Sequence, residues 1–208
     1  MVEPSLKILT EVASSLEKDW ISRGFKLRIT PDNLLTTPFL WGEEVNGIPA
    51  RYVALKTDMV EYGEMGIVYE AFEDFYPKAE KEIRTILEKG FGERILFKSM
   101  TLGYMDLFYD DILQHLRLDL LGTIPQLSKE GNSISLQLVI RHNTGRILVE
   151  IGKSPGLRDR EVYLAKWFYE SEISSLKELQ VEAFRGREIV RDLFQKSISE
   201  EMRKELYG

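Results

Sequence analysis

Residues 133–153 read SISLQLVIRHNTGRILVEIGK, and this stretch decides the kind of fold. Apolar residues recur at every second position on both sides of the segment 142–145, which is typical of two strands joined by a turn. An even-numbered loop gives the hairpin one wholly apolar face, and a slip by one residue would expose that face. We therefore expect a four-residue loop with Gly145 in the left-handed conformation. The expected strand pairs are Leu136–Ile151, Leu138–Val149 and Ile140–Ile147.

The opposite face of this hairpin carries a mixture of polar and apolar side chains. Its polar members are Gln137, Arg141, Arg146 and Glu150. Val139 and Leu148 lie among them and are too apolar for a freely solvated face. We expect the rest of the fold or a partner to cover these two residues, so they are the candidate interface residues.

Composition excludes several kinds of chemistry. The chain has 208 residues, of which 43% are hydrophobic and 30% charged, and it has no cysteine. Disulfides, thiolate zinc sites and cysteine nucleophiles are therefore excluded. No apolar run approaches a membrane span and no N-terminal stretch resembles a signal peptide, so we expect a cytoplasmic protein without membrane contact. Abundant Glu, Lys and Arg with no cysteine favour a thermophilic source.

The net charge of −6 is concentrated in one segment. Residues 57–88 contain nine acidic groups and three basic groups, which accounts for the whole excess. Such a segment would suit docking of a basic partner, and the overall acidity disfavours unspecific nucleic-acid binding.

The N-terminal half predicts a helix, strands and a second helix. An amphipathic helix begins at Pro4 and ends near Gly24, and Asn46-Gly47 signals a second hairpin with Trp41 opposite Tyr52. A helix capped by Asp74 follows and stops at Gly90, before a strand over 94–100.

The C-terminal half predicts an amphipathic helix over 104–121, a linker at 122–132, the hairpin, and helices from Gly156 onward. Because strands run consecutively instead of alternating with helices, we expect an α+β fold. Its sheet is mostly antiparallel, built from hairpins and flanked by amphipathic helices, with a helical C-terminus. We divide the chain into 1–124 and 125–208, with one continuous domain as the alternative.

One acidic stripe offers metal ligands. The predicted helix 104–121 carries Asp106, Asp110, Asp111, His115 and Asp119. Asp111, His115 and Asp119 are spaced four apart and form a stripe on one face. Carboxylates and imidazole together bind divalent metals. The competing interpretation is a solvated helix face, which we favour.

Two basic groups offer anion contacts. Lys153, Arg158 and Arg160 lie near an expected helix start, but the pattern of a phosphate-binding loop is incomplete there. Arg185, Arg187 and Arg191 would contact nucleic-acid phosphates from one helix. Acidic residues alternate with these arginines, so intrahelical ion pairs are the favoured interpretation.

No motif in the sequence identifies a family or an active site. We expect a non-enzymatic protein-interaction or adaptor protein that needs no cofactor and binds another protein or forms a homo-oligomer. The alternatives are a metal-dependent phosphoesterase or nuclease-type enzyme using the acidic stripe, and DNA binding through the segment 185–191.

Overall fold

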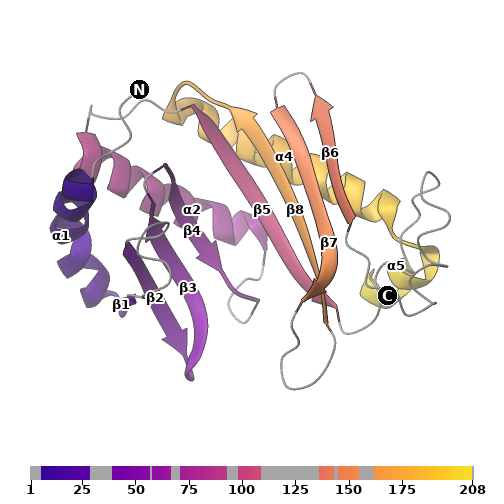
Figure 1. The fold of residues 1–208 in the computed structure, drawn as a ribbon, viewed down its shortest axis with the longest axis horizontal. Helices are drawn as coiled ribbons and strands as arrows, with labels where there is room; N and C mark the ends of the chain where they lie inside the picture. The colour runs from indigo at the N-terminus through magenta and orange to yellow at the C-terminus, as the bar shows by residue number, and fades with distance from the viewer. Residues whose placement is uncertain are drawn as a thin grey trace. The chain divides into compact units, whose positions relative to one another are not determined.

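The chain forms an α+β fold with two antiparallel sheets, as expected. The computed structural model describes residues 6–28, 39–56, 58–66, 71–92, 98–108, 136–142, 145–154 and 162–207. It divides into two compact units, Met1–Leu96 and Phe97–Gly208 (Figure 1). Each unit contains one four-stranded sheet and its own helices.

The first unit places two helical segments against a sheet with strand order β1-β2-β3-β4. In chain order its elements are α1 (Leu6–Ser22), β1 (Lys26–Arg28), β2 (Phe39–Val45), β3 (Ile48–Leu55), β4 (Val60–Glu64), α2 (Phe72–Thr85) and a π-helical turn, η2 (Ile86–Phe91).

The predicted N-terminal helix is confirmed as α1, which buries one face. Leu9, Val12 and Leu16 repeat at helical spacing and are buried. Trp20 closes the same face and lies against Trp41 of β2, with ring centroids 4.4 Å apart. The two indoles therefore join the helix to the sheet.

The predicted hairpin at Asn46-Gly47 is confirmed, but its predicted register is wrong. Both turn residues have positive φ, at 54° and 77°, as a tight hairpin turn requires. A bulge between Glu43 and Glu44 shifts the pairing, so Trp41 lies opposite Val53 and not opposite Tyr52. An extra residue on one strand is not visible in the alternation of side chains.

The second unit is a sheet with strand order β5-β8-β7-β6, and α4 packs against β5 and β8 (Figure 1). Its elements are β5 (Ser99–Phe108), β6 (Leu136–His142), β7 (Gly145–Ser154), β8 (Val162–Glu172), α4 (Leu176–Ser197) and α5 (Glu200–Tyr207). The helical C-terminus is as predicted.

The register predicted for residues 133–153 is confirmed in all three pairs. The predicted loop is wrong, because His142 and Gly145 still pair as strand residues, and Gly145 is not among the described glycines with positive φ. A Cβ atom at Gly145 would lie 1.9 Å from the carbonyl oxygen of Glu170. Glycine is needed here for close approach to β8, not for a left-handed turn.

Two segments that were predicted to be helical contain strands. Residues 104–108 belong to β5, and 109–121 lie outside the described residues. The segment from Gly156 was expected to be helical, yet 162–172 is the central strand β8. Its side chains are apolar on both faces, which obscures the strand period. The predicted boundary at 124/125 lies outside the described residues.

The N-cap residue of α4, Ser175, makes no side-chain cap hydrogen bond, but a glutamate of the first turn binds the residue before it. The first turn of α4 contains Glu178, whose carboxylate accepts hydrogen bonds from the backbone N and the Oγ of Ser174, at 2.8 and 2.9 Å. These donors stabilise the ionised carboxylate and lower the pKa of Glu178. These hydrogen bonds therefore hold the backbone in place at the junction between β8 and α4.

Gly186 of α4 provides a packing test. Alanine normally stabilises a helix by about 1 kcal/mol relative to glycine. A Cβ at Gly186, however, would lie 2.3 Å from Cδ1 of Tyr169, a buried ring whose hydroxyl is bound to Glu182. We expect Gly186→Ala to lower the free energy of unfolding by about 1–3 kcal/mol in equilibrium denaturation. Gly66→Ala is the control, because its Cβ would meet nothing within 4 Å; equal stability of Gly186→Ala and wild type would contradict this packing.

The hydrogen bonds between Glu178 and Ser174 predict a pH dependence of stability. Because the folded-state pKa of Glu178 is lowered, its stabilisation is present above the unfolded pKa and is lost as pH falls through the folded pKa. Glu178→Gln should therefore be less stable than wild type at neutral pH and equally stable at strongly acidic pH, as measured by thermal melts over a pH series. Glu172→Gln, which changes an exposed carboxylate on β8, is the control. A deficit that persists unchanged at acidic pH would rule out the carboxylate as its source.

Candidate functional site

Three glutamates have largely buried side chains, and they are the first candidates for chemistry. They are Glu64, Glu82 and Glu182, with side-chain exposures of 1%, 8% and 11%. A buried carboxylate is costly unless it is paired, and perturbed groups of this kind often mark active sites. Their partners therefore decide whether they are structural or functional.

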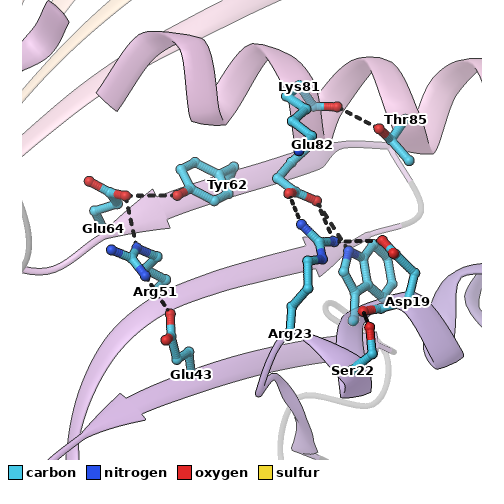
Figure 2. Close-up of polar contacts among 11 residues, drawn as sticks. Asp19, Ser22, Arg23, Glu43, Arg51, Tyr62, Glu64, Lys81, Glu82 and Thr85 are labelled. Atoms are coloured by element: carbon cyan, nitrogen blue, oxygen red, sulfur yellow. Dashed lines mark hydrogen bonds and ion pairs between the residues drawn. The ribbon is translucent and has the colours of Figure 1, made fainter. Parts of the chain in front are cut away.

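Glu82 of α2 is paired on both oxygens (Figure 2). Oε1 accepts a hydrogen bond from Arg23, and Oε2 accepts bonds from Arg23 at 3.0 Å and from Trp20 Nε1 at 3.2 Å. Asp19 contacts the same guanidinium at 2.9 Å. The hydrogen bond to Glu82 is the main cause that raises the pKa of Arg23. This ion pair joins the C-terminal end of α1 to α2.

Glu64 receives several donors on one oxygen (Figure 2). Oε1 accepts hydrogen bonds from Tyr62 at 2.8 Å, Arg51 at 3.1 Å and Lys78 at 3.4 Å. Arg51 also binds Glu43 at 2.8 Å. Burial, and then the hydrogen bond to Glu64, raises the pKa of Tyr62, so this phenol stays protonated and donates. The cluster links β2, β3 and β4 to α2.

Glu182 of α4 repeats this arrangement in the second unit. Oε2 accepts hydrogen bonds from Tyr169 and Ser171 of β8, both at 2.8 Å, and Oε1 binds Arg185 at 2.6 Å. Both oxygens are engaged. The carboxylate therefore joins α4 to β8.

These contacts indicate a structural role for the three glutamates. Each carboxylate is matched by at least one arginine, and a general acid or base must reach a reacting group. Ion pairs also neutralise part of the charge of the acidic segment 57–88. Four of its carboxylates are ion-paired, so its excess charge is not a continuous acidic surface. They are Glu61 with Lys56, Glu64 with Arg51, Glu80 with Arg84, and Glu82 with Arg23.

The predicted metal stripe is not assembled within the described residues. Asp110, Asp111 and His115 lie outside them, and Asp106 is an exposed residue of strand β5, not of a helix. Within the described ranges, no group of three or more His, Cys, Asp or Glu residues is placed to hold a metal ion.

The predicted anion sites fall into two cases. Arg158 and Arg160 lie outside the described residues, and only the backbone of Lys153 is described, paired with Tyr163. The arginines of α4 bind glutamates of their own helix, as the favoured interpretation expected. These pairs are Arg185–Glu182, Arg187–Glu188 and Arg191–Glu188.

The face of the second sheet opposite α4, here called the open face, contains both candidate interface residues. The register places Val139 of β6 beside Leu148 of β7, Leu148 beside Phe168 of β8, and Phe168 beside Gly103 of β5. These four residues form an apolar row across all four strands. The Phe168 ring lies over Gly103, where a Cβ would be 2.6 Å from it. Val139 is 49% exposed, and Leu148 and Phe168 are partly exposed.

Ion pairs border the apolar row on both sides. Arg146 Nε of β7 binds Glu170 of β8 at 2.7 Å on one side. Lys166 Nζ of β8 binds Glu150 of β7 at 3.3 Å on the other, and Glu150 also accepts a hydrogen bond from Gln137 at 3.0 Å. On β7 and β8 the apolar row thus lies between two charged rows, and Met105 of β5, which is 56% exposed, lies beside Lys166 on the same face.

Sequence reasoning identified only part of this face. Val139 and Leu148 were found because they belong to one hairpin. Phe168, Lys166 and Glu170 were missed because β8 was expected to be a helix. The concentration of aromatic residues in this segment, at Tyr163, Trp167, Phe168 and Tyr169, was the signal that could have revealed the strand.

Comparison with known proteins supplies no relative. No protein-family model, curated protein or solved structure matches the chain. Among the described helices, none is long and apolar enough to cross a membrane.

The Glu82 ion pair gives a stability prediction. Arg23→Met leaves a buried carboxylate with only the indole donor, which should lower the free energy of unfolding by about 2–3 kcal/mol. This loss of stability is at the lower end of the range for breaking a buried ion pair, because the Arg23 side chain is 31% exposed. Arg84→Met removes a more exposed pair four residues apart on α2 and should cost about 0.5 kcal/mol or less. Equal losses in the two variants, measured by urea denaturation, would disprove a special role for Glu82.

Proposed function

We propose that this chain is a non-enzymatic protein-interaction or adaptor protein and that it binds through the open face of the second sheet. The apolar row formed by Gly103, Phe168, Leu148 and Val139 carries the proposal. Antiparallel sheets often leave one face to solvent, but such a face is usually polar. A contiguous apolar strip between polar borders is typical of a protein-binding surface.

The remaining polar clusters support this choice over an enzyme. The buried glutamates use their charge inside the fold, as shown by Glu82 with Arg23 and Glu182 with Arg185. The α4 arginines are similarly occupied, which weakens the case for nucleic-acid binding. On the sequence grounds above, we place this function in the cytoplasm.

The proposal predicts that binding depends on Val139. We expect the tagged chain to capture a protein from a lysate of its source cells, and Val139→Asp to reduce that capture at least tenfold by quantitative mass spectrometry. The added charge would have to be desolvated in the interface. Val181→Asp is the matched control, because Val181 is 59% exposed on α4, away from the open face. Equal capture by the wild type and Val139→Asp would refute the proposed surface.

A further inference from the structure

On β7 and β8 the charges around the apolar row alternate in sign in both directions, whereas Arg141 of β6 lies beside Arg146 and is outside this pattern. Strand β8 carries Glu170 on one side of the row and Lys166 on the other. Strand β7 carries the opposite order, with Arg146 beside Glu170 and Glu150 beside Lys166. We call these four residues the charge checkerboard. If β7 and β8 exchange places, every position of the charge checkerboard receives a residue of the opposite charge.

We propose that the partner of the open face is a second copy of this chain, related by a twofold axis that runs parallel to the strands between β8 and β7. This inference rests on the proposed function and names its partner. Such an axis lays β8 of each copy over β7 of the other. Glu170 then meets Arg146 of the second copy, and Lys166 meets Glu150. All four cross-copy contacts join opposite charges.

The apolar row is also complementary to itself under this axis. The Phe168 position lies over Leu148 of the second copy, and Val139 lies over Gly103 of the second copy, where it meets the Phe168 ring that covers this glycine. The other in-plane axis, along the row, would stack Phe168 on Phe168 and Gly103 on Gly103. Because the Phe168 ring also covers Gly103, that arrangement would press two rings together at one place and hold the smaller side chains of the row apart, which close packing disfavours.

The balance of charge favours a second copy over a strongly charged partner. A uniformly acidic or basic surface would meet like charges at half of the charge checkerboard, which costs binding energy. A second copy brings no like charges together at the charge checkerboard. Two sheets packed in this way would lie about 10 Å apart with their strands nearly aligned.

The size of the patch sets the expected strength. Four strands spaced about 4.8 Å apart and three rows spaced about 7 Å apart cover only a small area, at the low end for specific interfaces. We therefore expect a dimer whose dissociation constant is about micromolar and which must be studied over a range of concentrations.

The test is sedimentation velocity of the purified full chain from submicromolar to high micromolar concentration. Wild type should shift from the monomer mass to twice that mass, whereas Val139→Asp should remain monomeric and Val181→Asp should dimerise like wild type. A wild type that stays monomeric, a dimer that survives Val139→Asp, or loss of the dimer in Val181→Asp would each overturn the proposal. If Val139→Asp does not fold, Val139→Thr keeps the side-chain shape and should raise the dissociation constant severalfold; an unchanged constant would count against the interface.

A charge swap tests the axis itself. Lys166→Glu combined with Glu150→Lys preserves the ion pair within each copy. It makes all β8 charges in the charge checkerboard negative and all β7 charges positive. Under the proposed axis β8 still faces β7, so dimerisation should persist within about twofold of wild type. Loss of the dimer in a folded double variant would overturn the proposed arrangement.

The two proposals fail in different ways. If wild type is monomeric at every concentration but captures another protein in a manner that depends on Val139, the second copy is refuted and the proposed function stands. If wild type is monomeric and capture is the same with Val139→Asp, both are refuted.

Discussion

The register of β8 is the constraint on which the second unit depends. This strand lies between β5 and β7, and its alternate residues face α4 or the open face. A slip by one residue would bring Lys166 and Glu170 beneath α4 in place of Tyr169. Burying those charges would cost several kcal/mol, so the packing of one face determines which side chains form the other.

Buried carboxylates add specificity to this packing. Glu182 reaches Tyr169 and Ser171 only when α4 lies in one position over β8, and Glu82 similarly selects the position of α2 beside Arg23. An ion pair of this kind adds little net stability, because desolvation offsets the attraction between the charges. Removing only one partner of such a pair is costly, because the other charge then stays buried and unpaired. We infer that the ion pair selects one arrangement of helix and sheet in each unit.

Local patterns explain which features were predictable. The pairing of Ile140 with Ile147 follows from alternation within one hairpin, and Val139 and Leu148 were identified from the same segment. The bulge at Glu43 was not predictable, because an extra residue leaves the pattern of residue types unchanged. Strand β8 was mistaken for a helix because apolar residues occupy both of its faces. Phe168, its contribution to the apolar row, was missed for that reason.

The sequence by itself determined the α+β class, the register of the hairpin in 133–153 and the presence of two apolar residues on its polar face. These properties depend on neighbours along the chain, where the two-residue period of a strand is visible. Only the tertiary structure decided that β8 lies between β5 and β7 and that Glu182 is buried against it. It also brought Glu170 beside Arg146 and Phe168 beside Leu148. Those pairings join segments separated in sequence, and the energy that selects them is the burial of the sheet against α4.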